Sequence, residues 1–340
     1  MAQHVYGIDL GTSNFKIFGA SSKKLINEKN VIAIKDKKEV FDFGDMAFEM
    51  YEKAPANIDV SFPVKYGVIA DIKNMDTLFE CFFSKLNGHH SGSGGGDFCI
   101  AVPTDITEVE KRAFYDLIAE SKVKSKHINV VEKPIADAVG LGLDVDSPKG
   151  NLIVNIGADT TEISVISLGG IVLSKLIKTG GTKLDETICN IVRKKYNLVI
   201  GHRTAEQVKI HLADAINSGE SKCVAFGRNI VTGLPASREI DSELVYMAIQ
   251  ESLYSIVDAI KVILERTPPE LSADIIDTGI FLTGGSAQIR NLDTLIRKET
   301  GLKVNVCDNP DETVIQGVAQ ILTNDKLSGL MYIPREKQYN

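Results

Sequence analysis

The residues with the clearest chemical potential lie in a short polar turn near the start of the chain, between two apolar segments. Asp9 lies near the end of the apolar run 5–10, and it is followed by the turn residues Gly11, Thr12, Ser13 and Asn14. Successive backbone N–H groups of such a turn can point into one small space and bind a phosphate, and a carboxylate at the strand end can hold a hydrated cation. The pattern predicts a nucleotide site, although the same turn is also typical of an ordinary β-hairpin.

The same plan occurs a second time at residues 152–165. An apolar run contains Asn155 near its end, and it is followed by the turn residues Gly157, Ala158, Asp159 and Thr160. Two phosphate-type hairpins about 146 residues apart suggest two duplicated halves that face one nucleotide.

A third glycine turn follows the apolar segment 279–283 and consists of Gly284, Gly285 and Ser286. Glycine allows a close approach of the backbone, which suits an adenine or a ribose. Three such turns favour nucleotide binding over three unrelated loops.

Amphipathic helices must position these turns. Apolar residues recur at helical spacing over 75–86 and again over 249–264, where Pro268 and Pro269 follow as a stop. Thr107 and Glu110 form a capping-box pattern at the start of another helix. We interpret both apolar stripes as core.

Further segments carry a resemblance to a known family. They are residues 102–107, 134–140, 165–169, 200–206, 232–235 and 265–271. Together with the three turns, they make the chain from about residue 5 to about residue 322 similar to the MreB family of bacterial actins. That family lies within the superfamily of actin, hexokinase and heat-shock ATPases. The resemblance implies an α/β actin-like ATPase fold with two duplicated, ribonuclease H-like lobes, each with a small inserted subdomain.

The resemblance also implies four subdomains and a hinge. The subdomains are IA (1–31, 75–147 and 312–340), IB (32–74), IIA (148–180 and 246–311) and IIB (181–245). The nucleotide would lie between the lobes. The helices that contain 134–140 and 313–317 would act as the hinge that converts nucleotide state into lobe angle.

The family pattern assigns roles in binding ATP or ADP with Mg²⁺. The amides of residues 11–14 would bind the β-phosphate, those of 157–160 would bind the γ-phosphate, and Thr160 would help to position the attacking water. Asp9 and Asn155 would support the water shell of Mg²⁺, and Gly284, Gly285 and Ser286 would line the adenine.

Three further assignments keep an alternative. Lys16 lies where actin has a phosphate-binding lysine, or it is a solvated lysine of a strand. Glu206 and Lys209 match the ribose contacts of the superfamily, but their i,i+3 spacing equally fits a surface ion pair.

Two positions depart from the family pattern. Lys133 stands before Pro134, where the family has the glutamate that orients the attacking water, and a cation cannot act as that base. Asn155 replaces an aspartate and so loses a charge. A register shift would let Glu132 replace the missing carboxylate, but neighbouring side chains on a helix point about 100° apart.

These changes predict a site that binds ATP and hydrolyses it slowly. Loss of a water-orienting residue typically lowers the rate on the order of 10²–10⁴-fold. Lys133 could offset part of the charge lost at Asn155 by meeting the γ-phosphate. We therefore expect a filament-forming cytoskeletal protein of cell shape with weak ATPase activity, self-assembling as protofilaments in antiparallel pairs.

Two alternatives stay open. The chain could be an impaired regulatory paralogue that copolymerises with a more active MreB protein. It could also be a monomeric chaperone or sugar kinase of the superfamily, although the sequence shows no peptide-binding domain after the ATPase region and no sugar-binding insert.

Composition limits the other function classes. The formal net charge of −7 argues against a nucleic-acid partner. The five cysteines show no metal-ligand spacing, which favours reduced thiols in the cytoplasm. The sequence shows no signal peptide, and the Gly- and Ser-rich loop 87–96 with His89 and His90 reads as solvated. It offers no apolar face, so we expect cytoplasmic filaments with weak or absent membrane binding.

Overall fold

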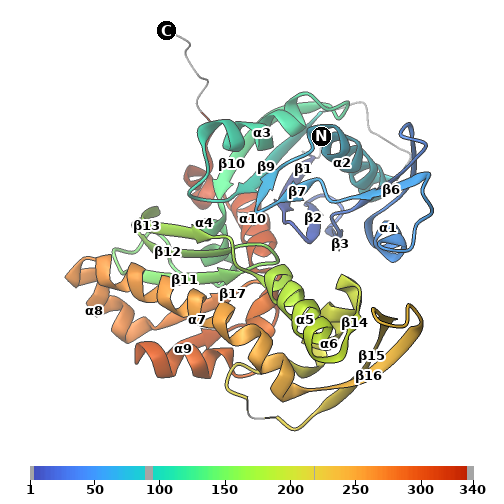
Figure 1. Ribbon diagram of the computed structural model, residues 1–340. Helices are drawn as coiled ribbons and strands as arrows, with labels where there is room; N and C mark the ends of the chain where they lie inside the picture. The colour runs from blue at the N-terminus through green and yellow to red at the C-terminus, as the bar shows by residue number, and fades with distance from the viewer. Residues whose placement is uncertain (1–3, 89–94, 218, 335–340) are drawn as a thin grey trace. The chain divides into compact units, whose positions relative to one another are not determined.

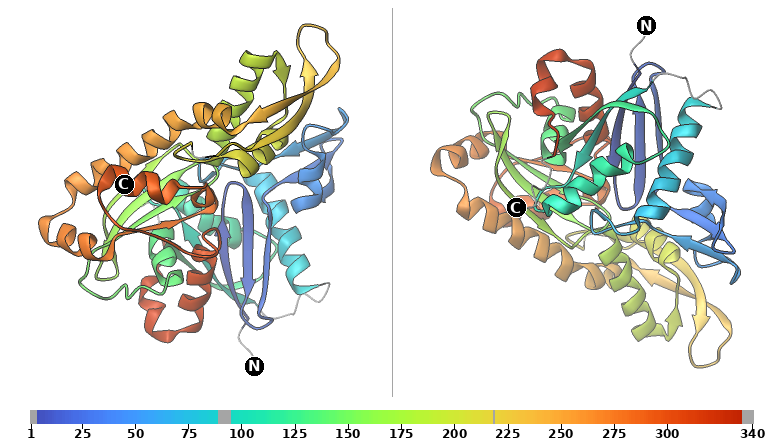
Figure 2. Two further views of the ribbon diagram at one scale, coloured as in Figure 1. Left: turned by 90° about the horizontal axis from the view of Figure 1, so that it is seen from below. Right: turned by 90° about the horizontal axis from the view of Figure 1, so that it is seen from above.

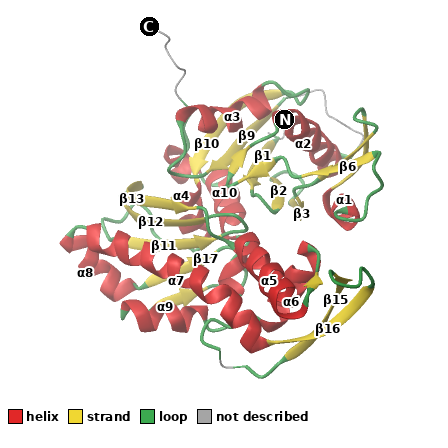
Figure 3. Cartoon of the chain, viewed as in Figure 1, coloured by secondary structure: helices red, strands yellow, loops and turns green. Residues whose placement is uncertain are grey.

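The computed structural model describes residues 4–88, 95–217 and 219–334, and it mixes helices and strands throughout (Figure 3). Its frame consists of two five-stranded sheets (Figure 1). The first sheet has the order β10-β9-β1-β2-β3. Its strands are β1 (Val5–Leu10), β2 (Asn14–Gly19), β3 (Lys24–Lys29), β9 (Gly96–Val102) and β10 (Ser125–Glu132). Strands β1, β2 and β3 pair as antiparallel neighbours, whereas β9 runs parallel to both β1 and β10.

The second sheet has the order β13-β12-β11-β17-β18. Its strands are β11 (Asn151–Ile156), β12 (Thr161–Ser167), β13 (Gly170–Ile177), β17 (Ile280–Thr283) and β18 (Val304–Val306). Strand β17 runs parallel to both β11 and β18. In each sheet, three strands that are consecutive in the chain lie side by side. Two further strands extend each sheet next to the first of these three and run parallel to it. Both units therefore have the same strand arrangement, which confirms the predicted duplication.

The chain divides into two units according to where its internal contacts lie. One unit is built from described residues within 1–148, 166–172 and 311–340, and the other from residues within 149–165 and 173–310. Each unit contains one of the two phosphate-type hairpins. The division into four subdomains stays a prediction.

The core of the first unit is rich in phenylalanine. Helix α2 (Ile72–Asn87) buries its predicted stripe, Met75, Leu78, Phe79, Phe82 and Leu86. The rings of Phe15 on β2 and Phe82 on α2 stack with centroids 4.6 Å apart. Helix α2, drawn in cyan, lies beside the blue strands in both views of Figure 2. Helix α3 (Glu108–Ala119) begins with the predicted capping box between Thr107 and Glu110.

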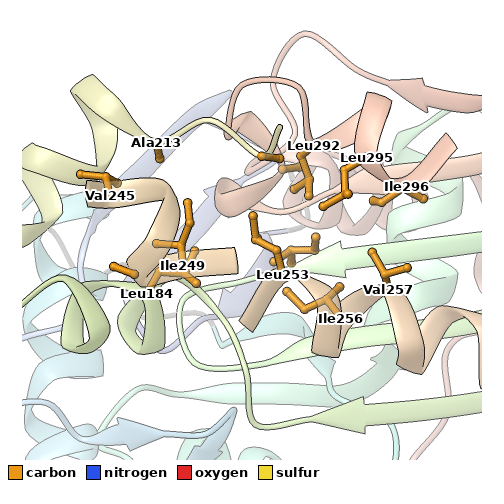
Figure 4. Close-up of a cluster of buried hydrophobic side chains, with 14 of the residues drawn as sticks. Leu184, Ala213, Val245, Ile249, Leu253, Ile256, Val257, Leu292, Leu295 and Ile296 are labelled. Carbon is orange, nitrogen blue, oxygen red and sulfur yellow. The ribbon is translucent and has the colours of Figure 1, made fainter. Parts of the chain in front are cut away.

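The core of the second unit is aliphatic and is organised by helix α7 (Ser242–Arg266). Figure 4 shows its residues Ile249, Leu253 and Ile256 packed with Leu184 of helix α5 (Gly181–Tyr196) and Leu295 of helix α9 (Leu292–Thr300). The predicted stripe over 249–264 is therefore core, and α7 ends just before Pro268.

The remaining elements complete the two units. Strands β4 (Ile32–Lys35), β5 (Glu39–Phe43) and β6 (Ile58–Ser61) form a small sheet, as do β14 (Leu198–Val199), β15 (Lys222–Asn229) and β16 (Pro235–Asp241). Strands β7 (Val64–Lys65) and β8 (Val68–Ile69) pair with each other. The other helices are α1 (Gly44–Met50), α4 (Lys133–Gly140), α6 (His202–Leu212), α8 (Pro269–Thr278) and α10 (Thr313–Thr323), with 3-10 helices η1 (Gly285–Gln288) and η2 (Asp325–Leu330).

The cysteines differ in burial. Cys99 is buried, and burial raises the pKa of its thiol to about 12. Cys81, Cys189, Cys223 and Cys307 are partly buried, and none of these described cysteines is in a disulfide. The reduced state stays a prediction. No helix among the described residues combines the length and apolar character needed to cross a bilayer.

Helices α4 and α10 of the first unit approach each other at two glycines. A Cβ atom added to Gly140 would lie 1.9 Å from the carbonyl oxygen of Thr313, and one added to Gly317 would lie 1.7 Å from that of Ala136. No side chain fits at such distances, so the two helix backbones pack directly. These are the helices that the family pattern assigns to the hinge, a role that stays a prediction.

We expect Gly317→Ala to destabilise the protein by about 2 kcal/mol or more, because the methyl group forces α4 and α10 apart. Thermal unfolding measures the effect. Gly329→Ala is the matched control, since no atom lies within 4 Å of the added Cβ there. Equal midpoints for the two variants would contradict the direct packing of the helix backbones.

Candidate functional site

Asp9 and Lys16 form a buried cross-strand pair. They stand directly opposite each other in the antiparallel register of β1 and β2. The Lys16 ammonium donates to Oδ2 of Asp9 at 3.1 Å, and the exposed fractions of the two side chains are 9% and 6%. The alternative of a solvated strand lysine is therefore wrong, because the partner of Lys16 is a buried carboxylate.

Lys133 reaches the same carboxylate from a different element. It is the first residue of α4 and directly follows β10, which runs parallel to β9 and hence to β1. The carboxyl ends of these strands lie at one edge of the sheet, so Lys133 comes close to Asp9. Its Nζ lies 3.0 Å from Oδ1 of Asp9 and donates to the carbonyl of Leu10 at 3.2 Å.

The two ammonium groups determine the protonation of Asp9. Burial raises the pKa of this carboxyl, but the charges of Lys133 and Lys16 outweigh that effect and lower it from 3.8 to about 2. Asp9 is therefore ionised at neutral pH, with one cation against each of its oxygens.

Glu132, the alternative to the missing catalytic glutamate, has other partners. It is the last residue of β10 and precedes α4, which corrects the expectation that Glu132 and Lys133 share a helix. The helix begins here because Pro134 suits its first turn. The hydroxyl of Tyr332 donates to Glu132, and Lys111 lies 3.4 Å from the same carboxylate. These contacts disfavour Glu132 as the residue that orients water.

The turn 11–14 is held by Asn30, a buried residue that the sequence analysis missed. The N–H of Gly11 donates to the carbonyl of Asn14 at 3.0 Å and closes the turn. The side-chain amide of Asn30 donates to the carbonyl of Gly11, and its backbone N–H donates to that of Ser13, both at 2.8 Å. In a trans peptide the N–H points opposite to the carbonyl, so the N–H groups of Thr12 and Asn14 point away from Asn30.

The polar side chains of this turn are also engaged. The hydroxyl of Ser13 accepts from the ammonium of Lys29 at 3.1 Å. The side-chain amide of Asn14 donates to Asn27, which itself donates to Glu312 at 3.2 Å. These side chains are thus engaged with other protein groups, and phosphate binding by the backbone of this turn stays a prediction.

The turn 157–160 repeats this design with different anchors. The N–H of Gly157 donates to the carbonyl of Thr160 at 2.9 Å, as Gly11 does to Asn14. The first residues of α5 donate to its carbonyls, Gly181 to Gly157 at 3.0 Å and Thr182 to Ala158 at 2.7 Å. The N–H groups of Ala158 and Asp159 belong to the same two peptides, so they point away from α5.

Asn155 occupies the position in the second unit that Asp9 occupies in the first. Each residue is the penultimate member of its strand and precedes the glycine turn by two residues. Asn155 lies opposite Thr283 in the parallel register of β11 and β17. The neutral amide therefore stands where the duplicated half has a carboxylate.

The third turn joins the second one. The hydroxyl of Ser286 donates to the carbonyl of Gly157 at 2.9 Å. Gly284 has φ +84, and a Cβ there would lie 2.4 Å from the carbonyl oxygen of Ile156, so only glycine fits. Residues 284–286 thus lie against the turn 157–160, as a shared site requires.

Lys209 joins the same group through α5. Its ammonium donates to the carbonyl of Gly181 at 2.9 Å and to Asp185 at 2.8 Å. Gly181 thus contacts both the phosphate-type turn and Lys209. Sequence analysis did not identify Gly181 as a site residue, although the Gly180-Gly181 pair before an amphipathic helix could have indicated it. Glu206 lies one turn earlier than Lys209 on α6.

The structure therefore gathers the predicted residues into two sets. Asp9, Lys16, Lys133 and the turn 11–14 meet in the first unit. The turn 157–160, residues 284–286 and Lys209 meet in the second unit. His89 and His90, interpreted as part of a solvated loop, lie outside the described residues.

Comparison with known proteins gives this arrangement a family. The family model described as MreB/Mbl protein matches residues 3–328. The chain belongs to the MreB/Mbl family. The cell shape-determining protein Mbl of Bacillus subtilis (strain 168) is 41% identical over 324 residues, which cover 94% of this chain and 96% of Mbl.

Two solved structures of MreB5 of Spiroplasma citri agree with the membership. Both are 30% identical to this chain. The structure bound to AMPPNP has a TM-score of 0.90 and covers 96% of this chain and 98% of MreB5. The structure bound to ADP has a TM-score of 0.89, with coverage of 95% and 97%. These similarities confirm the predicted actin-like fold.

The family pattern implies hydrated Mg²⁺ beside Asp9. The groups that surround Asp9 in this structure do not fit a divalent cation. Ammonium groups lie 3.1 Å and 3.0 Å from the two oxygens of Asp9. Within the part of the chain that the structure describes, no three His, Cys, Asp or Glu side chains are grouped closely enough to hold a metal ion. A divalent cation would have to approach Asp9 against two positive charges.

Asp185 gives the site a pH dependence that can be measured. Burial raises the pKa of its carboxyl from 3.8 to about 6, although Lys209 lowers it. One of its oxygens is buried and has no hydrogen-bond partner among the described residues. The folded protein thus takes up a proton at a higher pH than the unfolded chain does, so acidification from pH 7 to pH 5 favours folding.

We expect Asp185 to add about 1 kcal/mol to the free energy of unfolding between pH 7 and pH 5. Chemical denaturation at both pH values measures it. The Asp185→Asn variant should lack this gain. If the free energy of unfolding changes equally with pH in both proteins, the pKa of Asp185 in the folded protein is not raised above its value in the unfolded chain.

Proposed function

We propose that this chain binds ATP and ADP through the N–H groups of its two duplicated turns. Residues 11–14 bind the β-phosphate, and residues 157–160 bind the γ-phosphate. Two features support the proposal. The turn carbonyls are anchored by Asn30 in one half and by α5 in the other, which leaves N–H groups directed away from the anchors. In addition, the similar MreB5 is described bound to AMPPNP and to ADP.

The remaining residues of the second set complete the proposed nucleotide site. Glu206 and Lys209 contact the ribose, and Gly284, Gly285 and Ser286 line the adenine. The hydrogen bonds from Ser286 to Gly157 and from Lys209 to Gly181 support this assignment, because they tie both groups to the phosphate-type turn.

The position of Lys133 is the main support for slow ATP hydrolysis. Hydrolysis needs a group that accepts a hydrogen bond from the attacking water, and a lysine ammonium only donates. Lys133 is fixed against Asp9 and Leu10 at the start of α4. Glu132 is held by Tyr332 and Lys111. We infer that ATP is bound and hydrolysed slowly, with Thr160 left without its carboxylate partner.

The cellular role follows from the family. Mbl of Bacillus subtilis is named as a cell shape-determining protein. We propose that this chain forms filaments of its own kind in the cytoplasm and contributes to cell shape, with nucleotide binding as the driving step. The replaced glutamate also favours a second role, in which the chain copolymerises as a slow subunit with a more active MreB protein.

Steady-state phosphate release tests the slow site. In the presence of Mg²⁺, we expect Lys133→Glu to raise the rate on the order of tenfold or more, since it restores the missing acceptor. The double variant Lys133→Glu with Asn155→Asp should exceed either single variant, because charges around one site couple. Lys122→Glu is the matched control, with the same charge change at a lysine that is 89% exposed.

Lys133→Glu also replaces a partly buried partner of the buried Asp9 by a like charge, which we expect to cost about 3 kcal/mol of stability. Rates are therefore compared below the unfolding transition of each variant. Pelleting of the same samples with ATP or AMPPNP separates a filament from a monomeric ATPase. A wild-type rate equal to that of the double variant would contradict the slow site, and absence of any pellet would contradict the filament.

A further inference from the structure

We propose that Lys16 and Lys133 supply the positive charge that the family pattern assigns to Mg²⁺, so that this chain binds nucleotide without a divalent cation. The proposal rests on the proposed function, since it concerns the same phosphate-binding turn. It departs from the magnesium prediction made from the sequence.

Both carboxylate oxygens of Asp9 already face an ammonium group. Its Oδ2 accepts a hydrogen bond from Lys16 at 3.1 Å, and its Oδ1 lies 3.0 Å from the ammonium of Lys133. The three groups together carry one negative and two positive charges. The local charge is therefore already positive, which attracts a phosphate chain and opposes a second cation.

Both ammonium groups are also fixed in place. Lys16 is held by the strand register opposite Asp9. Lys133 is held at the start of α4 and donates to the carbonyl of Leu10, the residue directly before the phosphate-type turn. A lysine ammonium has three N–H donors, and Leu10 takes one of those of Lys133. We therefore expect an anion bound beside Gly11 to face a fixed ammonium group.

The second unit supports the proposal independently of the lysines. Asn155 occupies the strand position equivalent to Asp9 and carries no charge. The family pattern supports Mg²⁺ from two positions. At the first, the charge of Asp9 is neutralised by lysines, and at the second, Asn155 has no charge because it replaces an aspartate. Both changes lower the affinity for a divalent cation.

The test is calorimetric titration of this chain with ADP and with AMPPNP, in Mg²⁺ and in EDTA. We expect the two dissociation constants of each nucleotide to agree within about threefold. Binding in Mg²⁺ that weakens more than about tenfold in EDTA would overturn the proposal and leave the proposed function intact. Absence of binding in both buffers would overturn both.

Substitutions locate the effect. Lys133→Met and Lys16→Met should each weaken binding in EDTA at least about tenfold, and Mg²⁺ should restore part of the loss because the carboxylate of Asp9 is then less screened. Lys111→Met is the matched control, since Lys111 is as buried as Lys133 but pairs with Glu132. Equal losses in all three variants would overturn the proposal. The comparison of the two buffers in the wild type needs no variant to fold.

Discussion

The arrangement around the turn 11–14 in the first unit depends on how the buried carboxylate of Asp9 is neutralised. An ionised carboxylate in a protein interior is costly unless it is paired, and breaking one partner of a buried pair is more costly still. Here the partners are two lysines from different elements, one from the strand opposite and one from the first residue of α4. This arrangement fixes the start of α4, which in turn packs directly on α10.

A second constraint shapes both turns. Each peptide of a turn has its N–H and its carbonyl on opposite sides, so an element that binds the carbonyls directs the N–H groups the other way. Asn30 does this for the turn 11–14, and the first residues of α5 do it for the turn 157–160. The duplicated sheets thus keep the same turn geometry although the anchors differ. The equivalent strand positions differ in charge, because Asp9 is a carboxylate and Asn155 is a neutral amide.

The sequence predicted the features that are local in the chain. The hairpins, the helical stripes and the capping box at Thr107 depend on short-range spacing, and Lys133 stood out against a family pattern. Contacts between distant segments could not be read in this way. Asn30 and Tyr332 gave no local signal, and the shared contact of Lys16 and Lys133 with Asp9 follows from strand register and sheet order. The sequence pattern places Glu132 on a helix, because nothing local in the sequence marks that β10 ends at Glu132 and that α4 begins at Lys133.

In the proposed site, lysines stand in the place of a divalent cation beside Asp9. Crystals grown with AMPPNP and Mn²⁺ test it most directly, because manganese gives an anomalous signal that identifies its position. We expect no anomalous peak at Asp9, with the ammonium of Lys133 still near its present 3.0 Å from the carboxylate. A manganese peak beside Asp9, with Lys133 displaced from it, would contradict the claim.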